Sequence, residues 1–283
     1  MADLVKKIRT ASGDLQIDYN ALANLPALNN NLLINSDFRN PVNQRGKSIY
    51  TYNGDIAQYT VDRWRAKGVN VAVGDSSITV KNRSGSANSV FCQPFENNLI
   101  TGTYTVTIGC QNVVGTVYVC LNENGENKKL LSNGVNTFTF ASTSSASGLY
   151  LLFGASDNEE GLNLYYIKLE QGVSATPLVY KSYAEELRIC ERYYEESHMI
   201  LIPMNLTGTT KYFMAINGGD YKTTKRTSPT VTFKSFIDNA SNEVSVVVAG
   251  YTSDPKSFKR VAFSEVVAET YLLTTIYADA EIY

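Results

Sequence analysis

The stretch GTYTVTIGCQNVVGTVYVCL, residues 102–121, decides the fold class of this 283-residue chain. Its apolar residues occupy every second position in two series: Tyr104, Val106, Ile108 and Cys110, and then Val117, Val119 and Leu121. A period of two puts the members of each series on one face of a strand, and the Asn and Gly between the series are typical of a turn. The stretch therefore predicts two strands that each bury one face.

The same pattern extends over residues 31–176, where short alternating runs are broken by turn clusters at 122–125 and 132–134. We expect the inward faces of these runs to carry Phe138 and Phe140, Tyr150 and Leu152, and Tyr165, Ile167 and Leu169. Several strands at a spacing of about 8–12 residues, with turn signals between them, favour a sandwich or a barrel. No helical period of useful length interrupts them, so this region is predicted to be all-β.

Trp64 is the only tryptophan, and Asp62, Arg63 and Arg65 flank it. This setting indicates a strand end with an ion pair beside a buried ring. An indole ring can also serve as a platform on which a sugar stacks. We expect a core anchor and keep the glycan platform as the alternative.

A short helix is predicted between two β regions. Ser182 and Glu185 have the spacing of a capping box, and an apolar stripe follows at spacings of four, three and four: Tyr183, Leu187, Cys190 and Tyr194. The sequence predicts a helix over residues 182–196. Its stripe could dock on the sandwich or form a short three-helix contact in a trimer, since the spacing also suits a coiled-coil seam.

Residues after this helix return to a β pattern, with strand candidates at 211–214, 230–233, 243–248 and 274–277. The predicted fold class is therefore mainly β: a jelly-roll-like sandwich, a linking helix and a second small β domain behind an N-terminal arm. The predicted boundaries are 1–30 for the arm, 31–178 for the sandwich, 179–199 for the helix and 200–283 for the C-terminal domain.

The arm reads as a β-hairpin with strands at 4–10 and 15–19. A lone hairpin is at best marginally stable in water, so its apolar residues need a second surface. The arm either folds back on its own domain or docks on another protein. We expect it to dock on another protein. The candidate anchoring residues are Ile8, Leu15, Ile17, Tyr19, Leu22 and Leu25.

Composition limits the classes of function. A net charge of −2 and only 18% charged residues argue against a nucleic-acid binder, and no apolar run approaches the ~18 residues that span a bilayer. Residues 1–7 lack the apolar core of a secretory signal, so we expect synthesis in a cytoplasm. The expectation for Cys92, Cys110, Cys120 and Cys190 is four buried thiols, without disulfides or a zinc site.

Two groups of motifs about 130 residues apart carry a family resemblance. The first comprises NLLINSDF at 31–38, NQRG at 43–46 and TVDRW at 60–64, and the second comprises YIKLEQG at 166–172, ATP at 175–177 and LRICERYY at 187–194. Together they resemble bacteriophage tail-fibre and related virion-surface proteins that carry a carbohydrate-binding-like β-sandwich. Weaker similarities to these proteins occur at residues 7–20, 221–232 and 278–281.

The resemblance implies a phage virion protein, an anchored fibre or appendage that binds host-surface glycan and is not an enzyme. It implies a homotrimer, a virion protein of the tail, baseplate or capsid as the partner of the arm, and release from the bacterial cytoplasm on lysis. It also places Trp64 in the core and commonly turns the distal domain toward the host. A head fibre or capsid decoration protein without a receptor role is the alternative.

In related jelly rolls an acidic residue at each end of the sandwich can help to hold a structural calcium, and here these positions are Asp37 and Glu170. Calcium takes six to eight oxygen ligands, and only two carboxylates can be named. The sequence therefore predicts no firm metal site and no cofactor. Asp37 and Glu170 remain the calcium candidates.

Two loops of the C-terminal domain combine aromatic rings with amide or carboxylate groups, as sugar recognition does. The glycan-binding candidates are Asn217, Asp220, Tyr221, Tyr251 and Asp254. The lower alternative is a polysaccharide-degrading enzyme like a tailspike, which needs two carboxylates ~5–9.5 Å apart across a groove. No acidic pair lies in such a motif, no repeat of ~20 residues is visible, and nothing marks a nucleophile beside His198, the only histidine.

Overall fold

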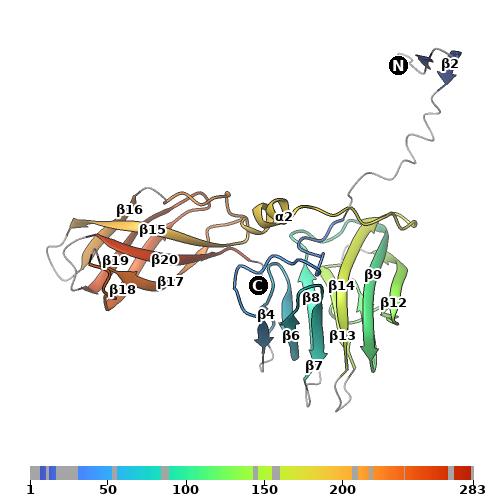
Figure 1. Cartoon of the computed structure of the whole chain (residues 1–283), viewed down its shortest axis with the longest axis horizontal. Coiled ribbons are helices and arrows are strands. Elements are labelled where there is room, and N and C mark those ends of the chain that lie inside the picture. Colours follow the sequence, from blue (N-terminus) through green and yellow to red (C-terminus); the bar gives the residue numbers. More distant parts are fainter. Residues whose placement is uncertain are drawn as a thin grey trace.

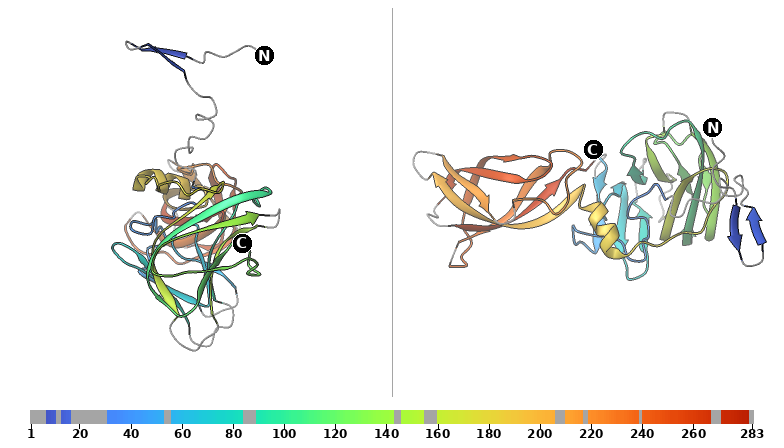
Figure 2. Two further views of the ribbon diagram at one scale, coloured as in Figure 1. Left: turned by 90° about the vertical axis from the view of Figure 1, so that its right-hand side faces the viewer. Right: turned by 90° about the horizontal axis from the view of Figure 1, so that it is seen from above.

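The computed structural model describes residues 7–10, 13–16, 31–52, 56–83, 89–142, 146–154, 160–205, 210–216, 219–238, 240–266 and 271–281. The fold is mainly β: a sandwich of two six-stranded sheets, one short helix, and a third six-stranded sheet near the C-terminus. The helix and the third sheet lie at one end of the sandwich (Figures 1 and 2). The predicted fold class is confirmed.

Both sheets of the sandwich are antiparallel, and they face each other across one core. Sheet I has the order β12 (Gly134–Ser142), β9 (Gly102–Val114), β14 (Gly161–Gln171), β7 (Ile78–Asn82), β6 (Val69–Val73) and β3 (Ile49–Thr51). Sheet II has the order β11 (Lys129–Leu130), β10 (Val117–Cys120), β13 (Gly148–Phe153), β8 (Ser89–Pro94), β5 (Arg65–Lys67) and β4 (Gln58–Tyr59). The stretch quoted first thus supplies one strand to each sheet.

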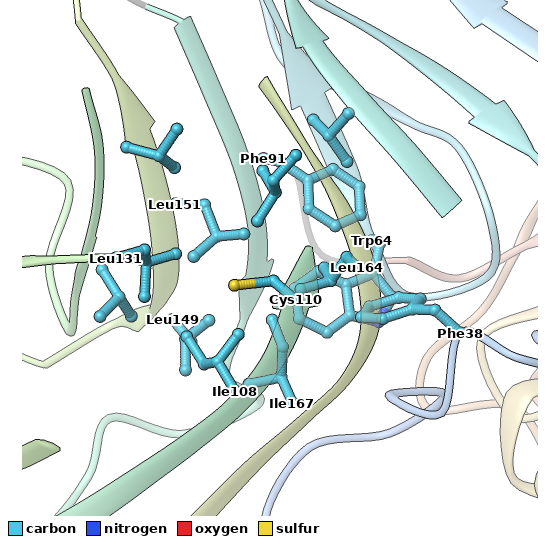
Figure 3. Packing of buried hydrophobic residues seen from close by; sticks show 14 of the residues in the cluster. Phe38, Trp64, Phe91, Ile108, Cys110, Leu131, Leu149, Leu151, Leu164 and Ile167 are labelled. Carbon is cyan, nitrogen blue, oxygen red and sulfur yellow. The ribbon is translucent and has the colours of Figure 1, made fainter. Parts of the chain in front are cut away.

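Trp64 lies at one end of the core and is fully buried. Its ring stacks on Phe91 and meets Phe38 edge-on, with both pairs of ring centroids 5.0 Å apart (Figure 3). The indole Nε1–H donates to the backbone oxygen of Asn35 at 2.8 Å. The prediction of a core anchor is confirmed, and the ring is closed to a sugar.

The predicted faces hold for β9 and β10 but fail in two places. On β13 the core residues are Leu149 and Leu151, whereas Tyr150 and Leu152 point outward. Both faces of this strand are apolar, so alternation could not distinguish inside from outside. On β14 a bulge between residues 164 and 166 shifts the register, which leaves Tyr165 only half-buried while Ile167 and Leu169 face the core.

The segment before β3 lies beside β14. Leu32 and Phe38 donate backbone hydrogen bonds to residues 169 and 165, and Ile167 donates to residue 36, at 2.8–2.9 Å. The segment is not a continuous strand, because Asn35 has a φ of +53°. Leu33 is buried, whereas Leu32 is 45% exposed.

Helix α2 (Tyr183–Cys190) begins with the predicted capping box between Ser182 and Glu185. The predicted end at residue 196 is wrong, because residues 191–193 form a turn and β15 begins at Tyr194. The helix contacts the sandwich through Glu186, whose carboxylate accepts the backbone N–H of Asn35. This contact agrees with docking of the helix on the sandwich.

Sheet III forms the C-terminal unit and curls on itself. Its order is β17 (Thr230–Ile237), β20 (Leu272–Asp279), β15 (Tyr194–Asn205), β16 (Lys211–Ile216), β19 (Phe258–Val266) and β18 (Val246–Ser253). The two edges approach each other where Val244 N–H donates to Phe236 O at 2.8 Å, around a core rich in phenylalanine. The predicted strands are present, and β15 begins inside the range 179–199 that was predicted as a linker.

The N-terminal hairpin consists of β1 (Lys7–Thr10) and β2 (Gly13–Gln16), with Ile8 opposite Leu15. Thr10 pairs with Gly13, so the connection is shorter than predicted. Ile17, Tyr19, Leu22 and Leu25 lie outside the described residues, and the anchoring role of all six candidates stays a prediction.

Candidate functional site

Four of the motifs meet where the sandwich joins the C-terminal unit, and we call this group the junction cluster: Arg45, Asp62, Arg63, Tyr193, Tyr194 and Glu281. Arg63 is 1% exposed, and its Nη1 lies 2.6 Å from Glu281 Oε2. Its Nη2 donates to the Pro94 oxygen at 3.0 Å, and the guanidinium lies 3.9 Å from the centre of the Tyr193 ring. A buried arginine of the sandwich is thus held by a carboxylate from the other end of the chain.

Arg45 extends this cluster. Its Nη1 is 3.4 Å from Asp62 Oδ1, its Nη2 is 3.7 Å from Glu281 Oε1, and its guanidinium stacks on Tyr194 at 3.9 Å. Asp62 is fully buried and accepts two bonds from Gln44, at 3.1 Å from the backbone N–H and 2.6 Å from the side chain. Burial raises the pKa of Asp62 to about 7, although Arg45 and Gln44 act in the opposite direction.

A second buried pair supports the same region from inside the C-terminal unit. Lys225 donates to the Glu195 carboxylate and to the Glu191 oxygen, and the side chains of Lys225 and Glu195 are fully buried. Burial lowers the pKa of Lys225, which Glu195 opposes. The charges at the junction thus lie beside oppositely charged groups of both units, which joins the sandwich to the C-terminal unit.

The two calcium candidates each have a cationic partner within the chain. Asp37 accepts from Arg39 at 2.8 and 2.9 Å. Glu170 accepts from the buried Lys168 ammonium at 3.0 Å and from the backbone and hydroxyl of Thr176 at 2.9 and 2.6 Å. Hydrogen bonds from Thr176 and Lys168 hold the pKa of Glu170 below its usual range, although burial opposes this. In the part of the chain that the structure describes, no three His, Cys, Asp or Glu side chains are grouped to hold a metal.

The structure brings only some of the predicted glycan-binding residues together. Tyr221 is 7% exposed, and its hydroxyl bonds Ser253 Oγ at 2.5 Å. Asp254 accepts from the backbone of residues 256 and 257 at 2.8 and 2.9 Å and pairs with Lys259 at 2.7 Å, which lowers its pKa. Asp220 pairs with residue 257 and lines a hollow of about 460 Å³.

The remaining two candidates do not join this group. Tyr251 is 39% exposed and lies on a different hollow, against Phe233 and Phe258. Asn217 lies outside the described residues. Apart from Tyr251, no aromatic face among the described candidates is open to a sugar.

The outer face of sheet II carries a candidate site that the motifs did not indicate. Strand register places one side chain from each of five strands in a row across this face: Leu130, Tyr118, Leu152, Val90 and Lys67. Directly paired residues of antiparallel strands point to the same face, with Cβ atoms about 5 Å apart. The row therefore runs from an exposed leucine, past a half-buried tyrosine and an apolar floor, to a lysine.

A hollow of about 470 Å³ opens over this row, and we call it the sheet II cleft. Its lining residues are Lys67, Ser89, Val90, Tyr118, Glu123, Asn124, Lys128, Leu152, Phe153 and Gly154. Lys128 Nζ lies 4.3 Å from the centre of the Tyr118 ring. Among the residues that the structure describes, no side-chain hydrogen bond or ion pair engages the Lys67 ammonium or the Glu123 carboxylate, and both groups line the cleft.

A second row lies beside the cleft floor and contains the buried Cys120, Tyr150 and Cys92, followed by the half-buried Arg65. Burial raises the pKa of the Cys92 thiol to about 12 and of the Cys110 and Cys120 thiols to about 11. All four cysteines are buried and free, as predicted. Cys92 and Cys120 act as small apolar residues beside the cleft floor, and Cys110 does so in the core of the sandwich.

No helix in the described part of the chain has the length and apolar character needed to cross a membrane. No protein-family model and no curated protein matches the sequence. Among solved structures, the N-terminal cellulose-binding domain of β-1,4-glucanase C from Cellulomonas fimi is 18% identical, over 40% of this chain and 90% of that chain, with a TM-score of 0.27. Discoidin II of Dictyostelium discoideum is 12% identical, over 74% of this chain and 84% of that one, with a TM-score of 0.22.

A third structure, PfGH50B, is 8% identical with a TM-score of 0.31, and the match covers 40% of this chain but only 23% of that protein. These likenesses concern the fold alone. They show no phage tail fibre, so that part of the resemblance stays a prediction.

Proposed function

We propose that this chain is a non-enzymatic glycan-binding protein, and that the sheet II cleft takes the sugar. The observation that carries the proposal is the row across sheet II, in which Tyr118 and an apolar floor lie between Lys67 and the loop that bears Glu123 and Asn124. A pyranose has one apolar face and a rim of hydroxyls. A tyrosine ring beside leucine and valine suits that face, and the amide, ammonium and carboxylate groups suit the hydroxyls.

The chemistry of the cleft favours binding over hydrolysis. Glycosidases place two carboxyl groups on either side of the scissile bond. Glu123 is the one carboxylate among the described lining residues of the cleft. His198, which is exposed on β15, bonds Thr275 Oγ1 at 2.8 Å and lies far along the chain from this lining.

The setting we propose is the surface of a phage virion, as an anchored fibre or appendage that binds host glycan. This part of the proposal rests on the resemblance at 31–46, 60–64 and 166–194, with the arm at 1–30 as the anchor to a virion protein. The alternative is a head fibre or capsid decoration protein without a receptor role. The hollow beside Asp220 is the second candidate sugar site, because a carboxylate and a glycine turn line it.

The test is binding of the fluorescently labelled full-length chain to a panel of bacterial strains and purified surface polysaccharides. We expect saturable, strain-selective binding that free polysaccharide displaces. Tyr118→Ala should weaken it about tenfold, since a stacking ring contributes roughly 1 kcal/mol or more. Tyr271→Ala, which removes a tyrosine that is 41% exposed in the C-terminal unit, is the matched control and should bind as the parent chain does.

Three other results of this binding experiment would each reject one part of the proposal. Binding that survives Tyr118→Ala but is lost in Asp220→Asn would move the sugar to the C-terminal hollow and disprove the cleft. Absence of binding across a panel that includes the host strain would reject the receptor role. The alternative, a capsid decoration protein, would then be the remaining candidate function. Release of reducing ends from a bound polysaccharide would reject the non-enzymatic assignment.

A further inference from the structure

Strand β12 forms an edge of sheet I that lacks the usual protection against pairing. It pairs with β9 at nine consecutive positions without a bulge, and no other described strand lies on its other side (Figure 1). Its sequence, GVNTFTFAS, contains no charged residue and no proline. At ~3.4 Å per residue it presents about 30 Å of flat strand edge.

The other edges of the three large sheets are protected. Strands β3, β4 and β11 are only two or three residues long. Strand β17 carries Lys234 and a bulge, and β18 has three shifts of register. Short strands, charges and bulges are the devices by which proteins prevent edge-to-edge pairing. Strand β12 has none of them, so its edge is suited to receive another strand.

Exposed apolar side chains gather on the same side of the sandwich. Val135 at the start of β12 is 68% exposed, and Leu130 on β11, the edge strand of sheet II, is 56% exposed. Only residues 131–133 connect the two strands, which places both edges together. Phe138, in the middle of β12, is only partly buried against the core. This side therefore has both free strand edges and apolar groups to cover.

We infer that β12 pairs antiparallel with β12 of a second copy of this chain. When the two-fold axis passes beside Phe138, every residue of the strand has a partner in the second copy. No other register pairs all nine residues. Thr137 then faces the partner's Thr139, Val135 faces the partner's Ala141, and Phe138 faces its own copy. Cross-strand Thr–Thr and aromatic pairs stabilise sheets, and no like charges meet.

The contact has two-fold symmetry, because the same edge is used on both copies. It joins sheet I of one copy to sheet I of the other in one continuous sheet, and it leaves the outer face of sheet II open. It predicts a dimer, whereas the family resemblance implies a trimer. The pairing does not depend on the sugar cleft, so the two proposals can fail separately.

The experiment measures the mass of the full-length chain by sedimentation equilibrium and compares three double variants. One carries Thr137→Lys with Thr139→Lys, and another carries Thr137→Glu with Thr139→Glu. The control carries Thr230→Lys with Thr232→Lys, on the exposed edge strand of sheet III. All four threonines are exposed, so each variant should fold as the parent chain does.

We expect the parent chain and the control to be dimers. The lysine and glutamate forms should each be monomers, with dissociation constants raised at least 100-fold. An equimolar mixture of these two forms should recover the dimer, because opposite charges then face each other at positions 137 and 139.

A monomeric parent chain, or a trimer whose mass the lysine form does not change, would overturn the inference. Dimers of the parent chain that the lysine and glutamate forms retain would place the contact elsewhere and would also overturn it.

Discussion

The junction cluster and the sheet II cleft are built from the same kinds of side chain but differ in what those side chains face. In the junction, Arg63 and Glu281 are buried and engage each other. In the cleft, Lys67 and Glu123 border open space beside Tyr118. The junction residues come from recognisable motifs, whereas those of the cleft do not. Motif-like sequence in this chain therefore lies where its parts are joined, and the proposed ligand surface lies elsewhere.

The physical reason is the cost of burying charge. An unpaired buried ion loses several kcal/mol of hydration, so each buried arginine requires a carboxylate at a fixed place and ring faces to pack on. The residue types at 45, 62, 63, 193 and 281 consequently depend on one another. Glu123 and Asn124 at the rim of the cleft are exposed, so burial of charge does not constrain these two residues.

The largest effect should follow from Glu281→Gln, which keeps the shape of the side chain but leaves Arg63 without its counter-charge. We expect the free energy of unfolding to fall by about 3–5 kcal/mol, the usual cost of breaking one side of a buried pair. Urea unfolding followed by tryptophan fluorescence measures this loss, because Trp64 is next to Arg63 in the sequence. The matched control is Asp37→Asn, which removes the half-exposed pair with Arg39 and should cost about 1 kcal/mol or less. Equal losses in the two variants would contradict the distinction between junction and surface.

The pH dependence of stability should come from Asp62. Burial raises its pKa to about 7, whereas in the unfolded chain it is about 4. The folded protein therefore holds a proton that the unfolded chain releases, so this contribution is complete below pH 4 and is lost as the pH rises toward 7. The slope is at most about 1.4 kcal/mol per pH unit.

Unfolding free energies of the parent chain and of Asp62→Asn at pH 4.5, 6 and 7.5 test this assignment. The difference between the two chains should shift in favour of the variant as the pH rises. A constant difference over this range would mean that Asp62 is ionised throughout, with Arg45 outweighing burial.

Local patterns predicted much of the fold. Alternation located β9 and β10, and the capping box located the start of α2. The end of the helix could not be predicted, because Tyr193 and Tyr194 pack on Arg63 and Arg45 from distant segments. The local stripe that included Tyr194 was overridden by these tertiary contacts.

The candidate site was less predictable than the fold. The C-terminal loops have the composition of a sugar site, but Tyr221 and Asp254 use their polar groups within the chain. Tyr118 lies between two inward-facing valines and gives no local signal of its own. Its cleft exists only because strand register aligns five segments between residues 67 and 130. The one available signal is a row of apolar residues with polar groups at its rim. This row can be recognised only when the register of the strands is known.

The smallest expected effect follows from a substitution at the rim of the cleft. Glu123→Gln should leave the free energy of unfolding within about 0.5 kcal/mol, as for other exposed positions. It should weaken sugar binding about fivefold, because a hydrogen bond to a charged acceptor is stronger than one to a neutral amide by roughly 1 kcal/mol. Glu126→Gln is the control, since Glu126 is exposed in the same loop but does not line the cleft. Equal weakening by both variants would indicate a general effect of loop charge, and only selective weakening by Glu123→Gln would place a sugar hydroxyl at this carboxylate.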